Sequence, residues 1–97
     1  MPKAYWVSAY HAIHDADKMA AYAKLAGPAV VSAGGRFLTR GVAAAAFEAG
    51  KVERTVVIEF PSLEAAIAAH ETPAYKAALE ALGDGATRDF RVIEGVE

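Results

Sequence analysis

Four segments of the chain carry the residue pattern of β-strands. Residues 4–11 alternate between two sets of side chains that are both rich in aromatic or small apolar residues, which indicates a strand covered on both faces. Residues 54–60 are dominated by β-branched and aromatic side chains and predict a second buried strand. Residues 36–40 and 88–96 predict two further strands, and a long hairpin loop over residues 41–50 joins the first of these to residues 54–60.

A stripe of apolar side chains with helical spacing predicts a first helix after residues 14–17, which hold N-cap candidates. We expect Gly27-Pro28 to interrupt this helix and residues 29–33 to form a second helical piece. The stripe consists of Met19, Tyr22, Ala23 and Ala26.

A second helical region follows the strand of residues 54–60. Ser62 is a cap candidate for a helix whose apolar stripe ends at His70. Thr72 and Pro73 then restart the helix, as its cap and its first helical residue.

The predicted order is strand, helix, strand, strand, helix, strand. This order is typical of the ferredoxin-like βαββαβ fold, an α+β fold in which both helices cover one face of a four-stranded antiparallel sheet. We expect one such domain over residues 1–97. The strands carry apolar residues on both faces, so we expect a second copy to cover the open face, sheet against sheet, as a homodimer.

The composition argues against several classes of function. The chain is 55% hydrophobic, which is more apolar surface than one small core can bury and therefore favours self-association. A formal net charge of -2 disfavours nucleic acids and anionic membranes as partners. The absence of cysteine excludes disulfides, a thiolate nucleophile and Cys-ligated metals. Without a signal-peptide pattern or a membrane span, we expect a cytoplasmic protein.

A series of short motifs lies along nearly the whole chain. In order they are Pro28, Gly34-Gly35-Arg36-Phe37-Leu38, Arg40-Gly41, Val56-Val57-Ile58-Glu59-Phe60-Pro61-Ser62, Thr72-Pro73-Ala74-Tyr75 and Ile93-Glu94-Gly95. This series resembles the family catalogued as domain of unknown function 1330. The resemblance implies a dimeric α/β barrel of ferredoxin-like protomers and supplies no established activity. The chain departs from the family at Ala69-His70, where relatives carry bulky aromatic residues, and at Ala81-Leu82-Gly83, near which they often carry an arginine.

His70 and Arg36 are the candidate catalytic residues. His70 ends an apolar stripe, where the loss of water leaves an imidazole neutral and able to accept a proton. Arg36 could steady negative charge that develops on a substrate. Two alternatives remain: His70 as a hydrogen-bonded core residue, and Arg36 with Glu59 as an ion pair at a subunit interface.

Five further residues are candidates for substrate binding. Tyr75 is expected to face the same space as His70, and aromatic side chains of the first strand could line a pocket or simply pack. His11 and His14 are of metal-ligating types, but we predict no metal or cofactor, because the acids beside them are explained as helix caps. The five candidates are Tyr75, Arg40, Glu59, Trp6 and His11.

These features support two kinds of function. The first is a cofactor-independent enzyme of the oxygenase, isomerase or decarboxylase type that acts on a small apolar or aromatic metabolite, an analogy with other dimeric α/β barrels. The alternative is a non-catalytic dimer that binds a small ligand or belongs to a stress response. A purely structural dimer is a third possibility.

Overall fold

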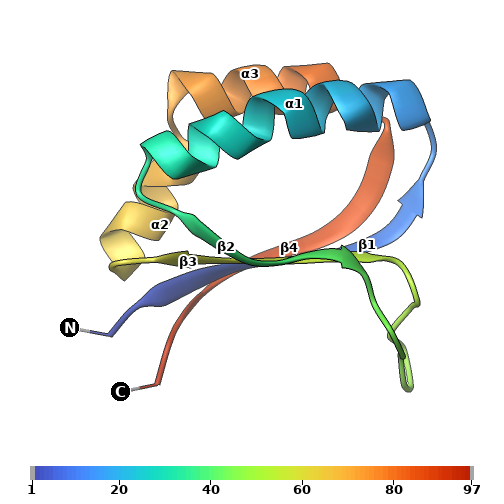
Figure 1. The fold of residues 1–97 in the computed structure, drawn as a ribbon, viewed down its shortest axis with the longest axis horizontal. Coiled ribbons are helices and arrows are strands. Elements are labelled where there is room, and N and C mark those ends of the chain that lie inside the picture. Colours follow the sequence, from blue (N-terminus) through green and yellow to red (C-terminus); the bar gives the residue numbers. More distant parts are fainter. Residues whose placement is uncertain (1, 97) are drawn as a thin grey trace.

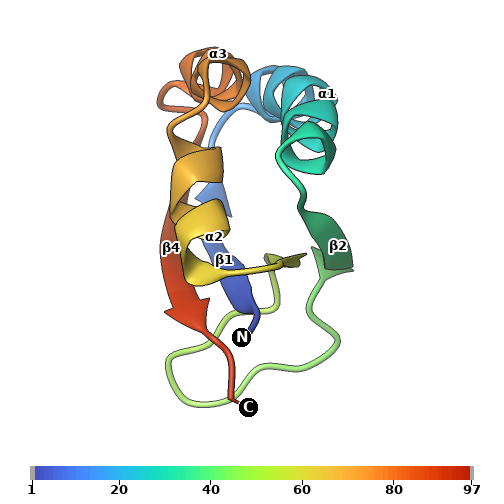
Figure 2. The ribbon, with the colours of Figure 1, turned by 90° about the vertical axis from the view of Figure 1, so that its left-hand side faces the viewer.

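The computed structural model describes residues 2–96, which form an antiparallel four-stranded sheet with its helices on one face (Figures 1 and 2). The strands lie in the order β2-β3-β1-β4. The predicted βαββαβ order is confirmed, with the second helical region divided in two. The elements are β1 (Ala4–Ile13), α1 (Ala16–Ser32), β2 (Arg36–Val42), β3 (Arg54–Phe60), α2 (Leu63–His70), α3 (Pro73–Leu82) and β4 (Ala86–Glu94).

Three capping residues set where the helices begin. Asp15, Ser62 and Thr72 each accept a hydrogen bond from a backbone N–H in the first turn of α1, α2 and α3. Pro73 then occupies the start of α3, where its fixed φ suits a helix and its missing N–H is not needed. The division between α2 and α3 therefore lies where the sequence predicted it.

Helix α1 continues through Gly27 and Pro28, which corrects the predicted interruption and the separate piece over residues 29–33. Pro28 removes one helical N–H, but its ring is exposed to solvent, while Ala26 and Ala29 on either side are buried. Packing of the buried face thus holds the helix together across the missing hydrogen bond. No helix within residues 2–96 combines the length and the apolar character that crossing a bilayer requires.

Aromatic side chains form the centre of the core between the sheet and the helices. Trp6 of β1 is 1% exposed, and its ring centroid lies 4.9 Å from the centroids of both Phe60 and Tyr75. Its Nε1 donates a hydrogen bond to the Ala66 carbonyl of α2 at 2.8 Å. This bond satisfies the indole and fixes α2 against the sheet.

A register shift in β2 aims two side chains at the helices. β2 is an edge strand, and its pairing with β3 shifts between Phe37 and Thr39. Phe37 pairs with Ile58 and Arg40 with Val56, and both partners face the core. Phe37 and Arg40 therefore lie on the same face of the sheet despite the odd spacing between them.

The other face of the sheet points away from all three helices (Figure 2). It carries Tyr5, Val7 and Ala9 of β1, which alternate with the buried inner residues of that strand. Ile93 of β4 is 57% exposed. Within residues 2–96 no element covers this outer face, in keeping with the expectation that the helices shelter only one side.

Candidate functional site

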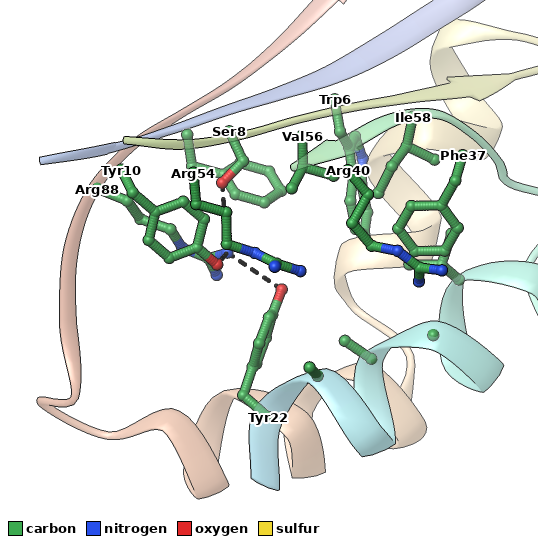
Figure 3. Close-up of a pocket in the computed structure, with 15 residues that line it drawn as sticks. Trp6, Ser8, Tyr10, Tyr22, Phe37, Arg40, Arg54, Val56, Ile58 and Arg88 are labelled. Atoms are coloured by element: carbon green, nitrogen blue, oxygen red, sulfur yellow. Dashed lines mark hydrogen bonds between the residues drawn. The ribbon is translucent and has the colours of Figure 1, made fainter. Parts of the chain in front are cut away.

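A pocket lies between the inner face of the sheet and α1 (Figure 3). Its empty space is about 430 Å³ when the solvent at its mouth is included. The centres of water molecules can occupy about 30 Å³ of it, so its inner part is narrow. All four strands and α1 contribute to its walls.

Apolar side chains make up most of the pocket wall. Those on the sheet come from β1, β2, β3 and β4, and those on α1 are small, which leaves room opposite the sheet (Figure 3). Such walls suit a carbon skeleton. The apolar lining residues are Trp6, Phe37, Val56, Ile58 and Phe90 on the sheet, and Ala23, Ala26, Gly27 and Val30 on α1.

Arg88 of β4 lies at one end of the pocket and is surrounded by hydroxyl groups. Its Nη1 donates to Tyr10 Oη at 3.0 Å, to Tyr22 Oη at 3.1 Å and to Ser8 Oγ at 3.4 Å. Its Nη2 donates to Tyr75 Oη at 3.3 Å. No carboxylate within residues 2–96 forms an ion pair with this guanidinium. We call Arg88 with these four hydroxyl residues the Arg88 cluster.

The Arg88 cluster has more protons to donate than oxygens to accept them. The hydroxyls of Tyr22 and Tyr75 are 2.6 Å apart, so one of them donates to the other. Both also accept from Arg88. The hydrogen bond between Tyr22 and Tyr75 uses only one of their two hydroxyl protons. The other of these protons, and the hydroxyl proton of Tyr10, have no acceptor among residues 2–96. The cluster therefore offers hydrogen bonds to an oxygen that enters the pocket.

The protonation states of the cluster make it a donor at neutral pH. Burial, followed by the adjacent Tyr22, raises the pKa of Tyr75 well above the ordinary value, so the hydroxyl stays protonated. Burial alone lowers the pKa of Arg88, but Tyr22 and Tyr75 outweigh it and the net pKa is raised. Arg88 remains a cation, and Tyr75 is no base.

Two more arginines line the pocket. Arg54 enters from β3, and its Nε is buried without a hydrogen-bond partner among the described residues. Its guanidinium extends into the space between Tyr10 and Arg40 in Figure 3. Arg40, an exposed residue of β2, lies with its Cζ 4.3 Å from the centroid of the Phe37 ring. Together with Arg88 they give the pocket three cations, and no Asp or Glu lines it.

Three residues predicted from the sequence lie at this site. Trp6 and Arg40 line the pocket. Tyr75 belongs to the Arg88 cluster and reaches it from α3. The structure thus brings together one predicted aromatic, one predicted cation and one predicted hydroxyl, each proposed here as a ligand contact.

His70 lies outside the pocket lining, at the end of α2. Its ring packs 5.3 Å from Tyr75, 5.4 Å from Phe90 and 6.0 Å from Trp6, measured between centroids. Its Nδ1 is 3.0 Å from the Glu71 carboxylate, and its side chain is 37% exposed. The space beside His70 is filled by aromatic rings, so a substrate in the pocket would meet Trp6 and Phe90 first.

Arg36 and Glu59 face the other side of the sheet. They are register partners on β2 and β3, and Arg36 Nη2 is 3.6 Å from Glu59 Oε1. Lys3 Nζ lies 3.2 Å from the same oxygen. Because the neighbours of Glu59 along β3, Ile58 and Phe60, are buried toward the helices, the ion pair belongs to the outer face. The structure therefore does not bring Arg36 and His70 together.

His11 also lies away from the pocket. It follows Tyr10 on β1, and its backbone carbonyl accepts a hydrogen bond from Lys51 Nζ of the hairpin loop at 3.4 Å. Within residues 2–96, His, Asp and Glu side chains form no group of three or more that could hold a metal ion.

The central residues of the pocket, Arg54, Arg88 and Tyr22, are not among the candidates from the sequence. A signal for the arginines exists: Arg88 precedes Phe90 and Val92 at every second position, and Arg54 precedes Val56 in the same way. A charged residue in register with the core-facing side chains of a strand is unusual and marks a position where a cation is kept inside.

The fold is shared with solved structures that have little sequence identity with the chain. One is a protein of unknown function from Rhodopseudomonas palustris, with a TM-score of 0.74, 15% identity, and 99% of this chain and 84% of that chain covered. SnoaB, a cofactor-independent oxygenase from Streptomyces nogalater, has a TM-score of 0.62 and 17% identity, with 100% and 96% covered. A dimeric ferredoxin-like protein of unknown function from Thermobifida fusca has a TM-score of 0.59 and 16% identity, with 99% and 92% covered.

These likenesses confirm the ferredoxin-like fold. No curated protein matches the sequence. The family described as "Domain of unknown function (DUF1330)" matches residues 3–96, nearly the whole chain. The resemblance found in the motifs is confirmed, and the chain belongs to the DUF1330 family.

Proposed function

We propose that the protein binds a small apolar or aromatic metabolite in the pocket between the sheet and α1 and acts on it as a cofactor-independent enzyme. The observation that carries this proposal is the composition of the pocket: apolar walls lead to the Arg88 cluster, which has protons without acceptors. A ligand with a carbon skeleton and one polar oxygen satisfies both parts.

The Arg88 cluster suits reactions in which negative charge develops on an oxygen. A fixed cation and aligned hydroxyls stabilise such charge in a site shielded from water. Isomerisation or decarboxylation through an enolate places charge on oxygen, and an electron-rich anion of this kind is also a starting point for oxygenation without a cofactor. SnoaB, whose fold is the same, is named a cofactor-independent oxygenase, which supports this reaction class by analogy alone.

A second candidate is a non-catalytic binding module. It is favoured by the absence of Asp, Glu and His from the pocket lining, together with the raised pKa of Tyr75, since these leave no evident general base. An enzyme at this site would need a substrate that gives up its own proton readily, or a base that reaches the site from elsewhere. The two candidates share the pocket and differ only in turnover.

Blocking the pocket tests ligand binding. Ala23 lines the pocket from α1, and Ala23→Trp places an indole in the space. Lys24→Trp puts the same side chain on an exposed position of the same helix and is the control. We expect indole or phenol to raise the Tm of the wild type and of Lys24→Trp, but not of Ala23→Trp, because a ligand at 100 times its Kd adds about 2.7 kcal/mol of stability. Equal Tm shifts in all three proteins would contradict the proposed site.

Turnover separates the two candidates. Mass spectrometry of a panel of aromatic metabolites incubated with the wild type, and with Ala23→Trp as the blocked control, shows whether a product forms in the pocket. Binding without a product supports the non-catalytic module. If products form, His70→Ala tests the role proposed for His70 as an acid or base: lost turnover with unchanged probe binding supports that role, and unchanged turnover removes it.

We further propose that two copies pair through the outer face of the sheet. The apolar side chains of Val7, Val57 and Ile93 on that face support this pairing. The fold neighbour from Thermobifida fusca is described as dimeric. The Arg36–Glu59 ion pair would then lie at the interface, as its alternative interpretation from the sequence has it.

A further inference from the structure

We propose that the ligand of this pocket is an organic anion with its charge on oxygen, a carboxylate or a phenolate, and that Arg54 and Arg88 bind that oxygen. The inference rests on the proposed small-molecule function and adds the charge of the ligand and the residues that select it. It follows from three features of the pocket: its charge balance, its unused donors and its apolar floor.

The charge of the pocket is unbalanced. Arg40, Arg54 and Arg88 line it, and no Asp or Glu does. None of the ion pairs among residues 2–96 includes any of the three. Arg40 is exposed, but Arg54 and Arg88 are half-buried. Holding these two cations partly away from water without a counterion is unfavourable, and an anion in the space between them offsets that penalty.

Arg54 has donors that the protein leaves unused. Buried polar atoms are nearly always hydrogen-bonded, yet Arg54 Nε has no partner among the described residues. Its guanidinium carbon lies 5.9 Å from the centroid of the Tyr10 ring, at the same end of the pocket as the Arg88 cluster. The planar fork of a guanidinium matches the two oxygens of a carboxylate. Arg54 is therefore the side chain that most needs an acceptor.

The Arg88 cluster supplies a second set of donors on the facing side. Tyr10 and one of Tyr22 and Tyr75 each have a hydroxyl proton without an acceptor among the described residues, and Arg88 adds its charge. A neutral alcohol or amide brings protons of its own, whereas the hydroxyl oxygens of the cluster already accept from Arg88. An ionised oxygen only accepts, so the pocket discriminates in its favour.

The rest of the pocket requires an organic body on this anion. Phe37, Val56 and Ile58 form an apolar floor beside the arginines (Figure 3). An inorganic anion such as phosphate leaves that floor bare. Arg40 lies over Phe37 at the exposed side, so the body of the ligand would run from the Arg88 cluster toward Arg40.

A chromogenic phenol tests the charge of the ligand directly. Para-nitrophenol absorbs visible light only as its phenolate, and a neighbouring cation lowers the pKa of an acid by about one to three units. We expect wild-type protein to lower the apparent pKa of the bound probe by about one unit. Arg54→Gln should lose most of that shift, and Lys24→Gln, which removes an exposed charge from the outside of α1, should keep it. Arg54→Met, which removes the charge and keeps a long side chain, should lose the shift in the same way and serves if Arg54→Gln does not fold.

Calorimetry with matched ligands tests the carboxylate. Phenylacetate should bind the wild type about tenfold or more tightly than phenylacetamide, its neutral analogue, because a buried charged hydrogen bond contributes about 1.5–3 kcal/mol. Arg54→Gln should remove this preference. Equal affinity for the two ligands together with an unshifted nitrophenol pKa, or a preference that survives Arg54→Gln, would overturn the proposal.

Together these experiments separate the classes of ligand, and they separate the present inference from the proposed function. A shifted nitrophenol without a preference for phenylacetate assigns the anion as a phenolate, and both effects together include carboxylates. Inorganic phosphate that displaces the probe as well as phenylacetate does would overturn the organic class. If indole binds the pocket but neither anion is preferred, only the present inference fails, and if no probe binds, the proposed function fails with it.

Discussion

At the scale of single residues, the burial of Tyr75 beside Arg88 ties stability to pH. Arg88 is half-buried among four hydroxyl groups and the rings of Tyr10, Tyr22 and Phe90. Tyr75 is 1% exposed and its pKa is raised, chiefly by burial. The folded state therefore favours the neutral phenol more strongly than the unfolded chain does.

We predict that stability falls at high pH because of Tyr75. A group whose folded pKa is raised contributes stability that is fully present below its unfolded pKa, here about 10, and is lost as the pH rises through the folded value. Urea unfolding of the wild type should therefore show a decline above pH 10 that is shallower in Tyr75→Phe. Tyr5→Phe, on the outer face, is the control and should follow the wild-type curve. Parallel curves for the wild type and Tyr75→Phe would contradict the assignment.

Sequence reasoning recovers the parts of the site that follow local rules. Trp6 and Tyr75 were predicted from the sequence because aromatic side chains in a strand or an apolar helical stripe turn inward. Arg54 and Arg88 were not, since a charged side chain is normally assigned to the solvated face of a strand. Only the alternation of each with core residues marks them, and the tyrosines that accept from Arg88 come from three different elements.

At the scale of elements, packing decides two details that local patterns misjudge or miss. Pro28 breaks the hydrogen-bond ladder of α1, yet the helix continues, because buried residues on both sides of Pro28 keep the same face on the sheet. The register shift in β2 has no signal in composition, although it places Arg40 at the pocket. The order of strands and helices, by contrast, follows from caps, turns and alternation.

The connection between α1 and β2 depends on a close approach at Gly35. A Cβ there would lie 2.6 Å from Val30 Cγ1 and 2.9 Å from the Phe60 ring, both in the buried core. We predict that Gly35→Ala lowers the free energy of unfolding by about 1–3 kcal/mol through overpacking. A Cβ at Gly41, on β2, meets nothing within 4 Å, so Gly41→Ala is the matched control and should cost little. Urea denaturation measures both, and equal losses would contradict the packing argument.

At the scale of the whole molecule, the sheet has a sheltered face and a bare one. All three helices lie on the side of the inner face, and no helix among residues 2–96 lies over the outer face (Figure 2). The expectation of a partner copy came from the same alternation in the sequence. The structure of one chain shows the apolar outer face, and a measurement of association in solution tests whether two copies pair through it.

We predict a homodimer that a single charge on the outer face disrupts. Val57 pairs with Val7 near the middle of that face, so Val57→Arg would bury unpaired charge between two sheets. Light scattering should give the wild type twice the mass of the 10.2 kDa chain and give Val57→Arg the mass of one chain. Val31→Arg, on an exposed site of α1 that is 63% accessible, should remain dimeric. A wild type that stays monomeric at micromolar concentration would refute the pairing.

Different elements provide the space and the charge of the pocket. The room in the pocket comes from the small residues Ala23, Ala26 and Gly27 on α1, whereas the arginines stand on strands. For the anionic ligand that we propose, a larger residue on the helix would reduce the length that fits and leave the arginines in place. Exchanging an arginine would instead alter the charge preference and leave the space unchanged. Under the proposed binding mode, the length and the charge of the ligand therefore depend on different elements, and substitutions can change one without the other.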